Sequence, residues 1–141
     1  MAKNAIIHST EKFQEKVGKI FETLESNLMS LRQKNEIGMI EFDRLFANEI
    51  NIAVKSVGTI HIYVDFKHQT INLESPTNGP HVFEWNDQQN GWCDHRKIFT
   101  LEWVMQNEFK NVVDTVNIFH DSGSNVTIEM MEKEKRKNKF E

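Results

Sequence analysis

Cysteine and proline are scarce in this chain of 141 residues. The single cysteine, Cys93, excludes an internal disulfide and is typical of a protein from a reducing compartment. One cysteine without a Cys-x-x-Cys pair also supplies too few ligands for a structural zinc site. Both prolines, Pro76 and Pro80, stand in the short polar stretch 75–80, which is therefore the strongest turn signal in the sequence.

Long apolar runs and common catalytic motifs are also missing. No apolar run approaches the roughly 18 residues that cross a membrane, so we expect no membrane segment. The N-terminal residues are too weakly apolar for a secretory signal. The sequence contains no glycine-rich phosphate loop, no Gly-x-Ser-x-Gly elbow and no His-Glu-x-x-His pair. Cys93-Asp94-His95 could in principle form a nucleophile pair on a strand, but we interpret Cys93 as non-catalytic.

Basic charge is in deficit. The chain has 21 acidic and 17 basic residues, a formal net charge of −4. Residues 131–141 hold five basic and three acidic side chains, a net +2, which leaves −6 on residues 1–130. An acidic body argues against a nucleic-acid partner and is compatible with a cation or a basic protein surface.

Length and composition indicate one globular domain. A chain of this size, 38% hydrophobic and 27% charged, can bury a single core without metal or disulfide. We expect residues 1–9 to be a flexible start or a degenerate presequence, and residues 10–120 to form the domain. Residues 121–141 are expected to be a charged, partly disordered extension. We expect a monomer.

A long amphipathic helix is predicted from Ser9 or Thr10 to about Leu31. Thr10 is a suitable N-cap, and Glu11 in the first turn favours the helix dipole. Apolar residues recur at steps of three and four along it, which predicts one buried stripe. The stripe consists of Phe13, Val17, Ile20, Phe21, Leu24, Leu28 and Leu31.

The face opposite that stripe carries an acidic line of Glu11, Glu15, Glu22 and Glu25. One interpretation is a solvated face with Glu–Lys pairs such as Glu15–Lys19, each worth about 0.2–0.5 kcal/mol. The other is a shallow, weak site for a hard cation, because such ions take carboxylate oxygens as ligands. Both interpretations stay open on the residues alone.

Short extended segments follow, and then a second helix. Strands are predicted over Met39–Leu45, Ile50–Val54, about 58–65, about 71–73, Val82–Trp85 and Trp92–His95, as an antiparallel meander. The second helix begins after Thr100 as N-cap, with a buried stripe that runs to Val116; Phe99 and Trp103 lie off that stripe, and residues 126–128 are expected to cover them. The fold class is α+β: a two-layer sandwich, with both helices on one face of an antiparallel sheet of five to seven strands. The other face, with Gln69, Thr70 and Asn72, is left wet and is a candidate docking surface.

Three pieces of the strand region carry a resemblance. Gly58-Thr59, the turn Ser75-Pro76-x-x-Gly79-Pro80, and Phe83-x-Trp85 followed by Trp92 resemble the frataxin family in order and spacing. The resemblance implies an accessory protein of iron–sulfur cluster assembly that binds iron (Fe2+/Fe3+) weakly on an acidic ridge. It further implies docking on the complex of cysteine desulfurase and iron–sulfur scaffold protein, with stimulation of sulfur transfer. A ferroxidase activity is also attributed to the family.

The resemblance also suggests site residues. Glu41-x-Asp43 resembles the carboxylate pair that the family carries beside its acidic first helix. Asn72 stands where the family has an exposed tryptophan, and Val82 stands where a basic residue often engages the partner. The implied metal ligands are Glu15, Glu22, Glu25, Glu41 and Asp43, and the implied partner-binding residues are Tyr63, Asp65, Gln69, Asn72, Val82 and Trp85.

Two alternatives stay beside the accessory function: a ferroxidase or iron-storage protein that uses the same carboxylates, and an α+β interaction module without iron. The expected location is a mitochondrion or mitochondrion-derived organelle, with the bacterial cytoplasm as the alternative.

Overall fold

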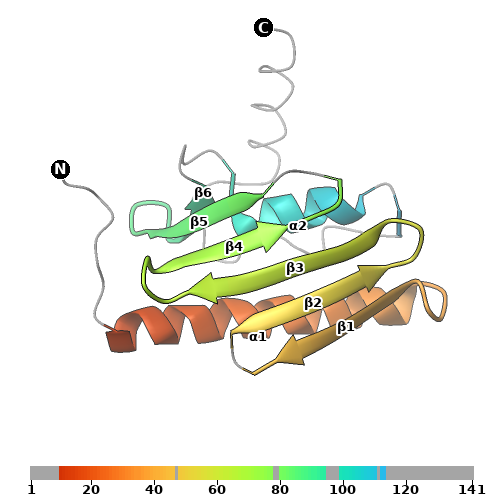
Figure 1. Cartoon of the computed structure of the whole chain (residues 1–141), viewed down its shortest axis with the longest axis horizontal. Coiled ribbons are helices and arrows are strands. Elements are labelled where there is room, and N and C mark those ends of the chain that lie inside the picture. Colours follow the sequence, from red (N-terminus) through yellow and green to blue (C-terminus); the bar gives the residue numbers. More distant parts are fainter. Residues whose placement is uncertain (1–9, 47, 78–79, 95–98, 111, 114–141) are drawn as a thin grey trace, which may run out of the picture.

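The computed structural model describes residues 10–46, 48–77, 80–94, 99–110 and 112–113. The long helix α1 (Thr10–Lys34) is followed by six strands and then by the short helix α2 (Leu101–Phe109). Figure 1 views the sheet face on, with both helices behind it. The strands are β1 (Ile40–Leu45), β2 (Glu49–Val54), β3 (Gly58–Asp65), β4 (Thr70–Glu74), β5 (His81–Asn86) and β6 (Gly91–Asp94).

The strands form one sheet in the order β1-β2-β3-β4-β5-β6, each antiparallel to its neighbour in the sequence. This meander and the two helices on one of its faces confirm the predicted α+β sandwich. The predicted strand limits differ from the observed ones by at most one residue. His95, predicted to end the last strand, lies outside the described residues, as do residues 1–9 and 121–141, for which separate segments were predicted.

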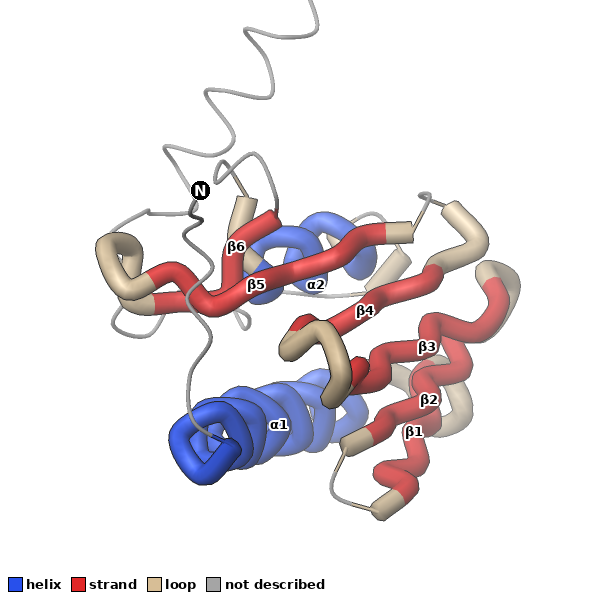
Figure 2. The backbone as a smooth tube through the Cα atoms, turned by 60° about the vertical axis from the view of Figure 1, so that its left-hand side comes forward, coloured by secondary structure: helices blue, strands red, loops and turns tan. Residues whose placement is uncertain are grey.

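The apolar stripe of α1 forms one half of the core. All seven predicted stripe residues are buried, from Phe13 to Leu31. Figure 2 shows that the sheet curves and that α1 lies on its inner side. Each large apolar side chain transferred from water contributes about 1.5–3 kcal/mol. The sheet residues that cover the stripe alternate along the strands: Ile40, Ile50, Ile52, Val54, Ile60, Ile62, Ile71, Leu73 and Phe83.

Helix α2 begins where it was predicted to begin. The Thr100 side chain accepts a hydrogen bond from the Trp103 backbone N–H at 3.1 Å. The helix ends at Phe109 rather than continuing towards Val116, because β-branched valines with low helix propensity follow. Val113 is still buried, whereas Val116 lies outside the described residues.

Two aromatic residues at the start of α2 are buried. Phe99 and Trp103 stack on each other, with ring centroids 4.5 Å apart. Both rings are therefore covered by other parts of the protein. Residues 126–128, which were predicted to supply that cover, lie outside the described part of the chain.

The β4–β5 loop contacts two other elements: Pro76 lies close to the start of β3, and Ser75 and Thr77 bind helix α2. Gly58 at the start of β3 has a φ of 129°, and a Cβ atom there would lie 3.0 Å from Pro76 Cγ. The hydroxyl groups of Ser75 and Thr77 each donate to Glu108 Oε1 of α2 at 2.7 Å. Because Glu108 is buried, these two hydrogen bonds tie the loop to the helix.

We expect Gly58→Ala to lower the free energy of unfolding by about 1–3 kcal/mol, since alanine is strained at this φ and meets Pro76. The matched control is Gly18→Ala in α1, where a Cβ atom meets nothing within 4 Å. That change is expected to raise stability by up to about 1 kcal/mol, because alanine favours the helix. Urea denaturation measures both. Equal effects of the two substitutions would contradict the role of Gly58.

We expect Glu108→Ala to lower the free energy of unfolding by about 2 kcal/mol, because it leaves two hydroxyl donors without their charged acceptor. The double variant Ser75→Ala/Glu108→Ala should lose less than the sum of the single variants. Urea denaturation of the four proteins measures this coupling. Strict additivity would show that the loop and α2 are not tied through these groups.

Candidate iron-binding and partner-binding surfaces

The acidic line of α1 is partly neutralised by an arginine of the sheet. Glu15 and Glu22 are exposed, whereas Glu25 is half-buried. The Arg44 guanidinium donates to Glu25 Oε1 at 2.9 Å. This ion pair joins α1 to the edge strand β1, so one of the predicted metal-binding carboxylates already has a cationic partner.

The acidic pair of β1 faces away from α1. Ile40, Phe42 and Arg44 turn towards the helix, so Glu41 and Asp43 lie on the opposite face of the sheet by strand alternation, and both are exposed. Arg32 at the end of α1 reaches the strand edge: its guanidinium lies over the Phe42 ring, and its Nη1 is 3.9 Å from Glu41 Oε1. Two arginines therefore lie between the acidic line of α1 and the acidic pair of β1.

The predicted metal ligands are spread along α1 and β1 and do not form one compact site. Among the described residues, no three or more Asp, Glu, His or Cys side chains gather in a way that could hold a metal ion. Glu22 and Glu25 do line one shallow hollow on α1. The carboxylate oxygens suit a hard cation, but their arrangement suits only loose binding with most of the hydration shell retained. In the described part of the chain Glu15 and Lys19 form no ion pair, although their spacing of four residues on the helix predicted one.

The open face of the sheet brings several predicted partner-binding residues together. Tyr63 pairs with Asn72, and Asn72 pairs with Val82, so the three lie in one row across β3, β4 and β5. Val82 is 44% exposed. Asp65 and Gln69 stand at the β3–β4 turn at one end of this face. Asp65 accepts hydrogen bonds from His68 through the backbone N–H and the ring Nδ1, which lowers the pKa of the Asp65 carboxyl.

One predicted partner-binding residue lies off this face, and one expectation about the face is wrong. Trp85 does not lie on it: Trp85 shares the helix side of β5 with the buried Phe83, because the two are two residues apart. Its indole N–H donates to Asp87 at 2.7 Å. Thr70, expected to be wet, is 6% exposed and accepts a hydrogen bond from Asn72 Nδ2.

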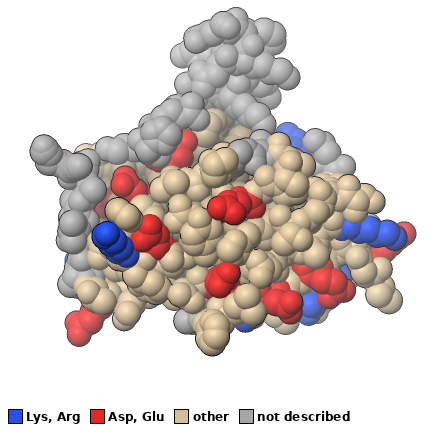
Figure 3. Space-filling view, in the orientation of Figure 1, with Lys and Arg blue, Asp and Glu red and all other residues tan. Residues whose placement is uncertain are grey.

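A polar network in the middle of the face was not predicted. His61 Nε2 contacts Glu49, the His61 and Tyr63 rings lie 4.8 Å apart, and the Tyr63 hydroxyl donates to Glu74 at 3.2 Å. The alternation of His61 and Tyr63 along β3 was the available signal. Figure 3 shows this side of the molecule, with acidic groups spread over it and few basic ones. Strand alternation places five acidic residues on it besides Glu41: Asp43, Glu49, Asp65, Glu74 and Glu84.

Cys93 is buried, in agreement with a non-catalytic interpretation, and its thiol lies 3.9 Å from the Gly91 carbonyl oxygen. His95, the other member of the candidate pair, lies outside the described residues. Within the described ranges no helix is long and apolar enough to cross a membrane.

Tyr63 gives a direct test of the network, because it is the single tyrosine of the chain. Partial burial raises the pKa of its phenol above the usual value of about 10, and the hydrogen bond and charge of Glu74 raise it further. This pKa shift favours folding at lower pH, and the contribution is lost as the pH rises through the folded-state pKa. We expect Glu74→Ala to lower the pKa of Tyr63 while leaving it above the ordinary value. Tyrosinate absorbance measures it; an unchanged pKa would contradict the contact.

Comparison with known proteins identifies the fold. The family model described as "Frataxin-like domain" matches residues 7–115. A search of curated proteins gives no significant match. Among solved structures, the chain is similar to frataxin from Psychromonas ingrahamii, with 13% identity and a TM-score of 0.59 over 81% of this chain and 100% of that one.

Trimeric frataxin from the yeast Saccharomyces cerevisiae, complexed with ferrous iron, is also similar. It has 18% identity and a TM-score of 0.59 over 81% of this chain and 94% of the yeast chain. These low identities establish a shared architecture, while the family match covers well over half of the sequence. The chain belongs to the frataxin family.

Proposed function

We propose that the protein is an iron-binding accessory protein of iron–sulfur cluster assembly. It docks on the complex of cysteine desulfurase and iron–sulfur scaffold protein and stimulates sulfur transfer. Family membership supports an iron-related role. The observation that carries the proposal is an open acidic sheet face beside exposed carboxylates on α1 and β1, with no described element over that face.

Iron binds weakly at the edge where α1 meets β1. The proposed ligands are drawn from Glu15, Glu22, Glu25, Glu41 and Asp43. Iron can bind Glu25 only by displacing Arg44, and Glu41 only by displacing Arg32. The two arginines therefore compete with iron for these carboxylates. Weak, exchangeable binding is suited to a protein that presents iron and does not store it.

The partner binds the open sheet face. Tyr63, Asn72 and Val82 form its central row, and Asp65 and Gln69 flank it at the β3–β4 turn. The acidic groups on this face favour a basic partner surface and speed the encounter. The exposed Val82 side chain contributes apolar contact. Trp85 is left out of this surface because it lies on the helix side.

A ferroxidase or iron-storage protein needs several carboxylates around one iron ion. The described residues supply no such group, and a ferrous oxidation assay separates this alternative from the accessory function. The compartment is that of the desulfurase: a mitochondrion or mitochondrion-derived organelle, or a bacterial cytoplasm. We propose that the protein acts as a monomer.

The arginine competition can be measured with Co2+ or with anaerobic Fe2+. We expect Arg32→Gln to tighten binding about twofold to fivefold, because an exposed ion pair is worth about 0.2–1 kcal/mol. Asp43→Asn should weaken binding. The matched control is Lys67→Gln, which removes one positive charge at the β3–β4 turn. Calorimetry measures the affinity. Equal effects of Arg32→Gln and Lys67→Gln would show that the affinity depends only on net charge and not on the Arg32–Glu41 contact.

Docking can be measured by reconstitution with a cysteine desulfurase and a scaffold protein. We expect the protein to increase the rate of sulfide production, and Val82→Glu to weaken that stimulation at least tenfold by placing a charge in the proposed contact. The matched control is Ile37→Glu in the fully exposed α1–β1 loop, which should stimulate normally. No stimulation by the wild-type protein would exclude the accessory function. Oxygen consumption proportional to protein and lost in Glu22→Ala would favour the ferroxidase instead.

A further inference from the structure

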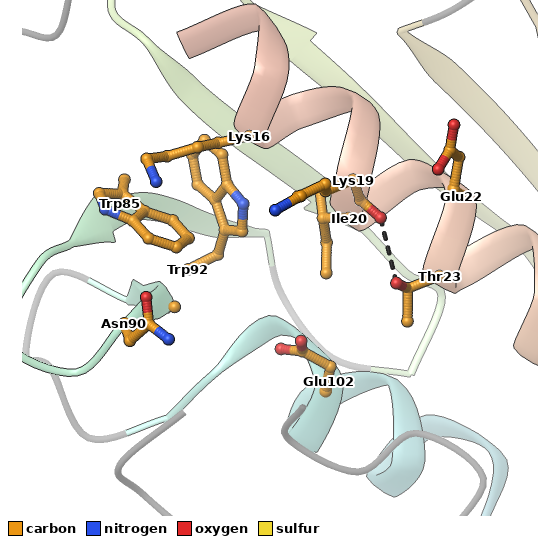
Figure 4. A pocket seen from close by; sticks show the side chains of 10 residues that line it. Lys16, Lys19, Ile20, Glu22, Thr23, Trp85, Asn90, Trp92 and Glu102 are labelled. Atoms are coloured by element: carbon orange, nitrogen blue, oxygen red, sulfur yellow. Dashed lines mark hydrogen bonds between the residues drawn. The ribbon is translucent and has the colours of Figure 1, made fainter. Parts of the chain in front are cut away.

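A cavity of about 390 Å³ lies between α1, the β5–β6 turn and the first turn of α2, away from the open sheet face (Figure 4). Its walls include Lys16 and Lys19 from α1, Trp85, Asn90 and Trp92 from the β5–β6 hairpin, and Glu102 from α2. Its volume falls within the range of small-molecule sites, about 300–1,000 Å³. Two predicted site residues, Glu22 and Trp85, line this cavity, but it lies away from the open sheet face and from the β1 carboxylates.

The first observation that points to a ligand is an unused buried donor. Trp92 is 2% exposed, and its indole Nε1–H finds no hydrogen-bond partner among the described residues. The ring is held edge to face by Phe13 and Trp85, at centroid distances of 5.9 and 5.7 Å. Figure 4 shows the indole nitrogen turned towards the cavity and the side of Lys19. A buried donor without an acceptor destabilises the protein, and a bound acceptor would remove that penalty.

The second observation is the pair of ammonium groups beside that donor. Lys16 and Lys19 are one helical turn apart on α1, so they project from the same side of the helix. Lys16 Nζ lies 4.0 Å from the centroid of the Trp85 ring, and Figure 4 shows Lys19 directed into the space beside Trp92. In the described part of the chain neither lysine forms an ion pair. Two cations and one N–H donor therefore line the same side of the cavity, and neither cation is neutralised by an ion pair among the described residues.

The remaining walls determine what else the ligand carries. Trp85 and Trp92 provide flat aromatic surfaces next to the cationic groups, and Ile20 adds an apolar contact. The Glu102 carboxylate lies across the cavity and disfavours a second negative charge at that end. The Thr23 hydroxyl is already used, since it donates to the Lys19 carbonyl at 3.1 Å. Glu22 of α1 also lines the cavity, so an anion is favoured only beside Lys16, Lys19 and the Trp92 N–H.

We propose that this cavity binds a small organic anion: a carboxylate or phosphate group held by Lys16, Lys19 and the Trp92 N–H, attached to a flat apolar body that packs on Trp85. The body of the protein is acidic, so long-range attraction does not bring an anion here and the local contacts must supply the affinity. The proposal does not depend on iron binding, because none of these anion-holding groups is a predicted iron ligand.

NMR of the Trp92 indole N–H tests the site in the full-length protein, with phenyl phosphate as the probe. We expect a saturable downfield shift of this signal as the N–H gains an acceptor. Inorganic phosphate has the anion without the ring, and benzyl alcohol has the ring without the anion, so each should bind at least tenfold more weakly. No shift at high phenyl phosphate would overturn the site, and equal affinity for benzyl alcohol would overturn the anion class.

Lysine variants distinguish binding in this cavity from an effect of net charge. Lys16→Met and Lys19→Met should each weaken phenyl phosphate about threefold to tenfold, the scale of one partly exposed charge contact. Lys34→Met, on the same helix but outside the cavity, should bind normally. Equal loss in all three would overturn the site. The Co2+ affinity of Lys16→Met and Lys19→Met should change no more than that of Lys34→Met. The anion site and the proposed iron site can therefore fail independently in these experiments. Trp92→Phe should also bind weakly, with urea denaturation confirming that it folds.

Discussion

Burial of the apolar stripe of α1 against one face of the sheet is the contact on which the other features depend. Seven side chains of the helix fill the inner side of a six-stranded meander. Because consecutive strand residues point to opposite faces, the same packing sends the polar residues of β1 to β5 outward onto a single open surface. The acidic face follows directly from the way in which the core is made.

The same packing explains why the acidic residues do not form one continuous ridge. Arg44 faces α1 because it alternates with Asp43, and it meets Glu25 there. Arg32 lies in the last turn of α1, where a cation favours the helix dipole, and is close enough to contact Glu41. The carboxylates that resemble the family pattern are therefore interleaved with cations. Under the proposed function, these cations compete with iron for the carboxylates.

The spacing of apolar residues was enough to predict the helices and strands, but not which side chains contact one another. The steps of three and four from Phe13 to Leu31 predicted α1 and its buried face, and Thr100 predicted the start of α2. The arginine pairs, the cover over Thr70 and the unused Trp92 donor depend on side chains distant in sequence, so no local pattern reports them. The side of the sheet on which Trp85 lies could be predicted, since its two-residue spacing from Phe83 already indicated the helix side.

The meander also has a consequence for how the chain folds. Every strand pairs with the strand next to it in the sequence, so the sheet can grow hairpin by hairpin with small losses of loop entropy. Topologies dominated by such local contacts fold faster than sheets with distant pairings. The non-local steps are the closure of α1 over the finished strands and the attachment of Glu108 to Ser75, 33 residues away. The docking of the two helices, and not strand pairing, therefore requires the larger losses of loop entropy.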